Sequence, residues 1–462
     1  MKNGTRVDDV MLAVRRLIAE RTLMPGAKLP SIRSFAETMA VSNSTVVDAY
    51  DRLVANGVIR SRRGSGFYVA GHPKPLSLTE TGPRLDRVVD PLWVSRQALE
   101  AGDRFLKPGC GWLPPSWFPE GNLRSALRHL SRDATSAGLT DYASPIGSPL
   151  LRNVLAQRLA ERGIEAEPHQ IVLTDGATQS VDLLCRFLLQ PGDTVLVDDP
   201  CYFNFLALLR AQRVQVVGVP RTQGGPDLEA LASAMAAYQP RLYVTNSVLH
   251  NPTGSSLSPV IAHKVLKLAE QWDLTIIEDD VYADLEHEPG TRLAAFDGLS
   301  RVIHVGSFSK TLTAAARCGY IAVRSDWVEA LLDLKVAVTF GASQLAAELI
   351  LTLLTDGSYH RHIYSLRERL ARAMSQTTTK LQSIGFEPYL QPDGGMFLWC
   401  RLPHGIDAID LARKALIENV VLAPGNVFST SSTASSFMRF NVAQSRDPQL
   451  FEVLARLLAE YH

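Results

Sequence analysis

Apolar residues in the first seventy positions recur at helical spacing in three short segments. A helix predicted over residues 5–21 has one apolar face, formed by Val7, Val10, Met11, Val14, Leu17 and Ile18. Ser31 and Ser42 stand where the N-caps of two further helices are expected, and Gly57 stands where the last helix ends. That helix is predicted to bury Val46, Val47, Tyr50, Leu53 and Val54. The stretch VIRSRRGSGFYVAG then predicts a two-stranded hairpin, because the two glycines of GSG allow a tight turn.

From about Pro91 onward, short β-rich runs alternate with amphipathic helical segments. The runs are QIVLT (170–174), TVLVDD (194–199), RLYVTNS (241–247), LTIIEDD (274–280) and RVIHVGS (301–307). The segments between them include SVDLLCRFLL and IAHKVLKLAEQW. Strands that alternate with helices predict an α/β fold with a mostly parallel sheet covered on both faces.

The chain is predicted to divide into two domains of unequal size. Residues 1–70 form the small one, residues 71–90 a linker that contains several glycines and prolines, and residues 91–462 the large one. The first seventy residues contain eleven basic and six acidic side chains, a net charge of +5, and because the whole chain is neutral the other residues sum to −5. This asymmetry favours an anionic partner for the small domain, although a solvated basic face would give the same count.

Three helices followed by a hairpin are the plan of a winged helix-turn-helix domain. In such a domain the third helix presents its first residues to the base edges and phosphates of double-stranded DNA, here Ser42, Asn43, Ser44 and Thr45. The hairpin lies against the adjacent DNA backbone through its basic residues, here Arg60, Arg62 and Arg63. A winged helix that docks onto another protein is the alternative.

The stretch LPSIRSFAETMAVSNSTVVDAYDRLVANGVIRSRRGSGFYV resembles the GntR family of bacterial repressors over about forty consecutive residues. The resemblance implies DNA contacts by Arg33, Ser44, Thr45 and the wing around Gly66. The family usually has arginine after the serine of the VS pair, and often after the TV pair, where this chain has Asn43 and Val47. DNA binding is still expected, but these departures leave the preferred operator sequence open.

Residues suited to a phosphorylated cofactor follow one another along the large domain. They include the acids that end TIIEDD, Asn251 in HNPTG, the helix start at Gly176, Ala177 and Thr178, and Lys310 with Ser307, Ser309 and Arg317 nearby. Pyridoxal phosphate requires such a set: a lysine for its aldehyde, a carboxylate for its pyridine nitrogen, and donors for its phosphate. Each residue alone has an ordinary structural explanation, but unrelated chains rarely supply the whole set in order.

The set resembles the fold-type I aminotransferases from about residue 105 to the end of the chain. The resemblance implies that Lys310 is the catalytic lysine that carries the cofactor covalently, and that Arg439 binds the α-carboxylate of a substrate. Asp279 would pair with the pyridine nitrogen; its rival is Asp280, but the family spacing of three residues to the tyrosine favours Asp279. The other implied cofactor contacts are Tyr282 and Asn251 at the phenolic oxygen, a stacking Tyr202, the phosphate ligands Ser307, Ser309 and Arg317, and Tyr142, which reaches the phosphate of the neighbouring subunit.

A GntR-like head on an aminotransferase-like body is the plan of the MocR regulators. The resemblance implies a transcription regulator that holds pyridoxal 5′-phosphate, responds to an amine or amino-acid effector and forms a head-to-tail homodimer. A linker of about twenty residues keeps the two domains near each other. Two alternatives stay open. One is a working aminotransferase that also binds DNA, because every expected catalytic group is present, and the other is a sensor of the cofactor itself.

The remaining sequence features are typical of a protein from a reducing compartment. The cysteines are scattered without a CxxC pair and are expected to be buried thiols: Cys110, Cys185, Cys201, Cys318 and Cys400. No metal site is expected. The first residues lack the apolar core of a signal peptide, and no run of about 18 apolar residues exists, so we expect no membrane span. We therefore expect a cytoplasmic protein.

Overall fold

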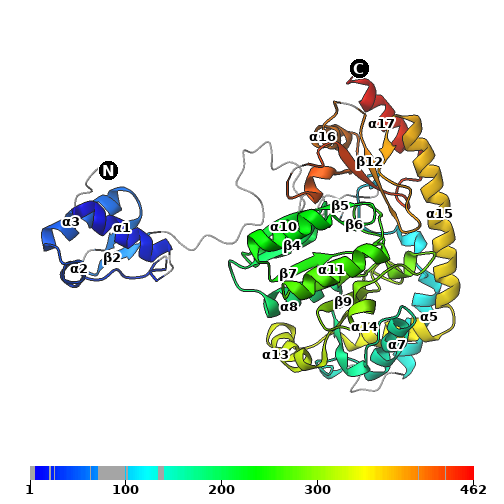
Figure 1. Ribbon diagram of the computed structural model, residues 1–462, viewed down its shortest axis with the longest axis horizontal. Helices are drawn as coiled ribbons and strands as arrows, with labels where there is room; N and C mark the ends of the chain where they lie inside the picture. The colour runs from blue at the N-terminus through cyan, green and yellow to red at the C-terminus, as the bar shows by residue number, and fades with distance from the viewer. Residues whose placement is uncertain are drawn as a thin grey trace. The chain divides into compact units, whose positions relative to one another are not determined.

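The computed structural model describes residues 6–19, 22–24, 26–62, 64–70, 99, 102, 104–133, 140–403, 405–431 and 433–461. The chain forms two compact units, Met1–Ser77 and Leu78–His462, each of which is described by itself (Figure 1). The predicted linker, residues 71–90, and the predicted wing residue Arg63 lie outside the described residues.

The small unit contains the three helices and the hairpin that the sequence predicts. Its elements are α1 (Arg6–Ala19), α2 (Ile32–Met39), α3 (Asn43–Ala55), β1 (Ile59–Arg62) and β2 (Gly66–Val69). Ser31 and Ser42 cap α2 and α3, because their side chains accept hydrogen bonds from backbone N–H groups of the first turn. The strands β1 and β2 pair antiparallel. All of these elements pack on one core, whose buried members include Val10, Val14, Phe35, Val46, Tyr50, Leu53, Ile59 and Val69.

One prediction about α3 is wrong. The side chain of Val47 is 38% exposed, whereas Val46, Ala49, Tyr50 and Leu53 are buried. Successive helical residues are rotated by about 100°, so Val47 lies to the side of the stripe that Val46 shares with the three other buried residues. The predicted end of the helix is confirmed, since Gly57 follows the C-cap residue with a φ of +67°.

The large unit is built on an eight-stranded sheet. In spatial order its strands are β3 (Ile171–Thr174), β10 (Gly319–Ala322), β9 (Val302–Ser307), β8 (Thr275–Asp279), β7 (Leu242–Thr245), β4 (Thr194–Asp199), β5 (Gln215–Thr222) and β6 (Gly225–Pro226). The strands from β9 to β5 are parallel, whereas β10 runs against both of its neighbours. The predicted parallel sheet and its five predicted strands are confirmed. The carboxyl ends of β3, β4, β7, β8 and β9 therefore lie at one edge of the sheet.

Helices cover both faces of this sheet, as predicted (Figure 1). One face packs on α8 (Ala177–Leu188), α9 (Phe203–Ala211) and α13 (Val328–Thr339), and the other on α7 (Pro149–Ala160), α11 (Pro259–Gln271) and α14 (Gln344–Thr355). Neighbouring strand residues such as Ile276 and Ile277 belong to different cores, because side chains alternate across a strand. Burial on both faces explains why these strands are continuous apolar runs.

A smaller antiparallel sheet forms from the last part of the chain. Its spatial order is β11 (Glu387–Pro388), β12 (Phe397–Arg401), β14 (Phe437–Asn441) and β13 (Ala423–Pro424). It packs with α15 (Tyr359–Ser383) and α16 (Ala408–Ile417), and α17 (Pro448–Ala459) packs on α16. Further helices among the described residues are α5 (Glu120–Asp133), α10 (Leu228–Tyr238), α12 (Leu293–Asp297) and the 3-10 turns η2 (Pro115–Trp117), η3 (Pro168–Gln170), η4 (Ala283–Leu285), η5 (Ser325–Trp327) and η6 (Gly425–Phe428).

All five cysteines are free and buried, as expected from the sequence. In the part of the chain that the structure describes, no single helix is long and apolar enough to cross a membrane; one strongly bent pair, Ser325–Thr339 with Gln344–Thr355, passes that test by length and composition only.

Candidate functional site

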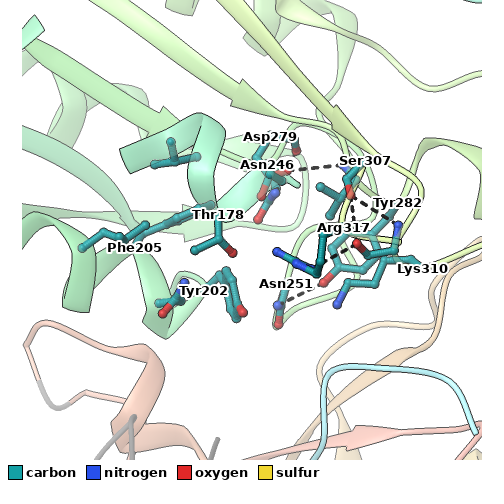
Figure 2. A pocket seen from close by; sticks show the side chains of 16 residues that line it. Thr178, Tyr202, Phe205, Asn246, Asn251, Asp279, Tyr282, Ser307, Lys310 and Arg317 are labelled. Carbon is teal, nitrogen blue, oxygen red and sulfur yellow. Dashed lines mark hydrogen bonds between the residues drawn. The ribbon is translucent and has the colours of Figure 1, made fainter. Parts of the chain in front are cut away.

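A pocket opens at the edge of the large sheet where the parallel strands end (Figure 2). Most of the residues predicted for the cofactor line it: Ala177, Thr178, Tyr202, Asn251, Asp279, Tyr282, Ser307, Ser309, Lys310 and Arg317. Six further residues line the pocket that were not predicted from the sequence: Val181, Asn204, Phe205, Leu208, Asn246 and Val281. Of these, Asn246 had a usable signal, because it directly follows a buried strand at the edge where ligands of such folds bind.

One end of the pocket is built to hold an anion. Gly176 caps α8 with a φ of +96° and no side-chain cap, so the first amides of the helix remain free to donate to a ligand. Arg317 packs so closely on this turn that a Cβ on Gly176 would lie 2.7 Å from the Arg317 Nη2 atom. The Ser309 hydroxyl lies within 3.1 Å of the Ser307 hydroxyl and 3.5 Å of Arg317 Nη1. Helix amides, hydroxyls and a guanidinium are the donors that a phosphate group requires.

Lys310 reaches the pocket from the loop after β9. Its Nζ atom donates to the Gly111 carbonyl oxygen at 2.7 Å. Burial, reinforced by the positive charge of Arg439, lowers the pKa of Lys310 to about 8. A much larger fraction of this amine is therefore uncharged near neutral pH than for an exposed lysine, and an uncharged amine can attack an aldehyde.

The two neighbouring acids at the end of β8 have different surroundings. Asp280 accepts a hydrogen bond from Arg292 Nε at 2.7 Å and lies 3.1 Å from His304 Nε2, and these groups hold the pKa of its carboxyl far below the usual range. Asp279 lines the pocket instead, and burial raises the pKa of its carboxyl to about 6. Of these two acids, Asp279 lines the pocket, whereas the carboxylate of Asp280 is already paired with Arg292 and His304.

A chain of polar contacts joins Tyr282 to Arg439. The Asn251 amide donates to the Tyr282 hydroxyl at 3.3 Å, and its Oδ1 atom accepts from Arg439 Nη1 at 2.8 Å. Arg439 Nη2 donates to the Gly109 carbonyl oxygen at 2.6 Å. The Arg439 Nε atom is buried and has no partner among the described residues, and burial lowers the pKa of this side chain. A desolvated guanidinium with an unused donor is a site for a carboxylate.

Tyr142 does not enter the pocket of its own chain. Its side chain is 85% exposed and stacks on the Phe340 ring at a centroid distance of 5.3 Å. The described part of a single chain therefore brings together all of the predicted pocket residues except Tyr142.

The small unit exposes most of the residues predicted to contact DNA. Arg33, Ser42, Asn43, Ser44, Arg60, Arg62 and Gly66 are exposed, and Thr45 is half-buried. The hydroxyls of Ser44 and Thr45 both lie 2.8 Å from the Ser42 Oγ atom, which fixes the first turn of α3. In the hairpin, the Arg62 guanidinium lies 4.7 Å from the centre of the Tyr68 ring, which orders a long cationic side chain at the surface.

Comparison with known proteins relates both units to families. Residues 118–457 match the family described as aminotransferase class I and II, and residues 6–69 match the bacterial regulatory proteins of the gntR family. The chain is 32% identical to the HTH-type transcriptional regulator YdcR of Escherichia coli K12, over 97% of each chain. It is 24% identical to the HTH-type transcriptional regulator NorG of Staphylococcus aureus USA300, over 87% of this chain and 93% of the relative. The chain belongs to the aminotransferase class I and II family, with the architecture of a MocR-type transcription regulator.

Solved structures resemble the large unit of this MocR-type protein. An archaeal alanine:glyoxylate aminotransferase is 26% identical with a TM-score of 0.74, over 83% of this chain and 96% of that one. The α-aminoadipate aminotransferase LysN of Thermus thermophilus, solved with N-(5′-phosphopyridoxyl)-L-leucine, is 25% identical with a TM-score of 0.72, over 83% of this chain and 99% of that one. The predicted fold-type I architecture is confirmed.

We expect Arg62→Ala to weaken binding of this MocR-type regulator to its operator and to flatten the salt dependence. An arginine that neutralises one phosphate contributes about −0.9 to the slope of log affinity against log salt concentration, so the slope should change by roughly that amount. Fluorescence anisotropy at several salt concentrations measures it. Arg52→Ala is the matched control, because Arg52 is exposed but bound to Asp48 by hydrogen bonds of 3.0 and 3.1 Å. An equal slope in wild type and Arg62→Ala would exclude Arg62 from the interface.

Proposed function

We propose that this chain is a pyridoxal-5′-phosphate-dependent transcription regulator whose large domain senses the cofactor, or an amine or amino acid that reacts with it. The observation that carries this proposal is one pocket that contains a partly buried lysine, a carboxylate, a tyrosine–asparagine pair and an anion cradle, in a chain with a gntR-type head. Residues 1–70 would contact double-stranded operator DNA, residues 71–90 would act as the linker, and residues 91–462 would hold the cofactor.

The donor set of the pocket fits pyridoxal phosphate. The amides at the start of α8, together with Ser307, Ser309 and Arg317, would hold its phosphate. Asp279 would pair with the pyridine nitrogen, and Asn251 and Tyr282 would hold the phenolic oxygen. Tyr202, which lines the pocket, would stack on the ring. When bound, pyridoxal phosphate supplies an aldehyde that captures amines and a ring that withdraws electrons from them.

The protein's own groups prepare this chemistry. Lys310 Nζ would carry the cofactor covalently, which requires loss of a proton that burial already favours, since its pKa is about 8. Once the amine is engaged, its hydrogen bond to the Gly111 carbonyl oxygen must change. Asn251 and Tyr282 stay in place through their contacts with each other and with Arg439, and so orient whatever occupies the pocket.

Arg439 would select effectors that carry a carboxylate. We expect Arg439→Ala to weaken binding of an amino-acid effector by roughly ten- to a hundredfold, because a charge-assisted pair is lost, and to change cofactor affinity much less. Spectral titration of both ligands measures the two effects. The amine that lacks only the carboxylate of that amino acid is the matched control, and its affinity should not change. Equal losses for effector and cofactor would refute this role.

A ligand can regulate DNA binding only if it binds two states of the protein with different affinity. Two hydrogen bonds support a coupling between ligand binding and the DNA-binding domain, namely Arg439 to Gly109 and Lys310 to Gly111. The two acceptors, Gly109 and Gly111, belong to the segment through which the chain enters the large domain from its N-terminal side. Ligands that engage Lys310 and Arg439 would compete for these carbonyl contacts.

A working aminotransferase that also binds DNA is the second candidate, and the intact donor set favours it. The test is the absorbance spectrum of the purified protein titrated with amino acids and amines. Conversion of the visible band to that of the pyridoxamine form would demonstrate at least half of a transamination and identify the effector class. A band unchanged by every compound would favour a sensor of the cofactor itself.

We further propose a head-to-tail homodimer that acts in the cytoplasm. The exposed ring of Tyr142 supports the dimer, because the resemblance assigns it to the phosphate of the neighbouring subunit. Its stacking partner Phe340, at the end of α13, is exposed too, and further exposed apolar side chains lie on α13 and at the start of α14, namely Val336, Val338 and Leu345. A regulator of this family meets its operator in the cytoplasm.

A further inference from the structure

A second cavity lies at the opposite edge of the large sheet, where the parallel strands begin. Its volume is about 330 Å³, and its lining includes Arg241, Asp273, Thr275, Arg301, Arg324 and Trp327. Arg241 and Arg301 directly precede β7 and β9, Thr275 opens β8, and Arg324 follows β10, which runs the other way. Four neighbouring strands thus bring these side chains together. None of these side chains lines the pocket that contains Lys310.

Three arginines and a single carboxylate line this cavity. Arg301 Nη1 lies 2.7 Å from Asp273 Oδ1, but the Asp273 side chain is 94% exposed, so water competes for the pair. Arg324 Nε lies 2.6 Å from Asp326 Oδ1, and its Nη1 atom makes a long hydrogen bond of 3.4 Å to the Ser300 carbonyl oxygen, so neither terminal nitrogen pairs with a carboxylate of the described residues. Among the described residues the guanidinium of Arg241 makes no hydrogen bond, and only its charge acts on Asp273. This excess of positive charge is local, because residues 71–462 sum to a net negative charge.

We propose that this cavity binds a small organic phosphate. Guanidinium groups match the geometry of phosphate oxygens and bind them with charge-assisted hydrogen bonds, and the hydroxyl of Thr275 adds a donor. The Trp327 indole, whose ring lies 5.2 Å from the Arg324 guanidinium, gives the organic part an apolar wall. The volume lies in the range of small-molecule sites, roughly 300–1,000 Å³. A phosphate dianion offers more charge than Asp273 and would displace that exposed carboxylate from Arg301.

The proposal is tested by isothermal titration calorimetry, in which the full-length protein is titrated with AMP and, separately, with glycerol 3-phosphate. Adenosine and glycerol are the matched ligands that lack the phosphate. We expect at least one phosphate to bind saturably, its matched ligand not to bind, and Arg241→Gln and Arg301→Gln each to weaken binding by about tenfold or more. Arg317→Gln is the control variant, because it removes the arginine of the pocket that contains Lys310, here called the first pocket. The affinity of the second cavity for the phosphate ligand should stay the same in this variant.

Three results would overturn the proposal. One is that neither phosphate binds saturably. Another is that binding survives in Arg241→Gln and Arg301→Gln but disappears in Arg317→Gln, which would assign the ligand to the first pocket. The third is that Arg241→Gln weakens operator binding while the phosphates never bind, which would assign the arginines to the DNA backbone. Circular dichroism of each variant shows whether it is folded.

Discussion

Replacing Lys310 with alanine is expected to abolish covalent retention of pyridoxal phosphate. The remaining contacts, namely the start of α8, Arg317, Asp279 and Asn251, would still bind the cofactor reversibly, but no amine in the pocket could hold it through a bond. Borohydride reduction followed by mass spectrometry of the denatured chain measures retention. Wild type should gain the mass of one reduced cofactor, whereas Lys310→Ala should gain none and should lose its visible absorbance on dialysis.

Lys335 provides a matched control for this experiment. Lys335 is buried whereas Lys310 is partly buried, but in both side chains desolvation lowers the pKa of the amine to about 8. The Nζ atom of Lys335 also donates to a backbone carbonyl oxygen, that of Pro145. It lies on α13 and does not line the pocket. Lys335→Ala should therefore keep the adduct. An adduct retained in Lys310→Ala but lost in Lys335→Ala would show that a low amine pKa without the surrounding donors is enough, and the assignment of Lys310 would be wrong.

Much of the architecture could be predicted from short-range patterns. Helix caps such as Ser31 and Ser42 need only their own first turn, and strands such as β8 are apolar runs whatever lies beside them. Val47 was predicted to be buried because it is one of five apolar residues on the third helix. These five residues span more of the helix surface than the buried stripe does, so Val47 at its side is exposed. The smaller antiparallel sheet was not predicted from the sequence. Two of its four strands, β11 and β13, have only two residues each and give no periodic signal.

The site was predictable where a side chain carries the chemistry and unpredictable where the backbone does. Lys310 and Arg439 are recognisable residues at recognisable spacings, but their partners Gly111 and Gly109 contribute carbonyl oxygens, which every residue has. The arginines of the second cavity are spread over more than eighty residues of sequence and converge only because β7, β8, β9 and β10 are neighbours. Sequence patterns within one segment cannot reveal such a convergence.

The same substitution to asparagine should affect different properties at Asp279 and Asp280, namely cofactor binding at Asp279 and stability at Asp280. Asp279→Asn is expected to weaken pyridoxal phosphate binding by roughly ten- to a hundredfold, because the partner of the pyridine nitrogen loses its charge. Asp280→Asn should instead lower the free energy of unfolding by about 3 kcal/mol, since it breaks a buried ion pair. This loss of stability is near the low end of the range for a broken buried ion pair, because Arg292 keeps its contact with Glu286 at 2.8 Å. Cofactor titration and urea unfolding measure the two effects.

The stability of the cofactor-free protein should also depend on Asp279 through pH. Its carboxyl pKa is raised by burial from 3.8 to about 6, so between these values the folded chain holds a proton that the unfolded chain has lost. Stability therefore falls as the pH rises from about 4 to 6, by as much as about 3 kcal/mol, and stays lower above that range. Asp279→Asn removes this dependence and should be at least as stable as wild type at pH 7.

The comparison of the two variants separates a ligand-binding carboxylate from a structural one. A folded Asp280→Asn protein should still bind the cofactor with an affinity close to that of wild type, because Asp280 does not line the pocket. If Asp279→Asn were the variant that unfolds more easily, or if Asp280→Asn lost the cofactor while remaining folded, the roles would be reversed. The pyridine nitrogen would then have to pair with the carboxylate that already neutralises Arg292, which would leave that guanidinium with Glu286 alone.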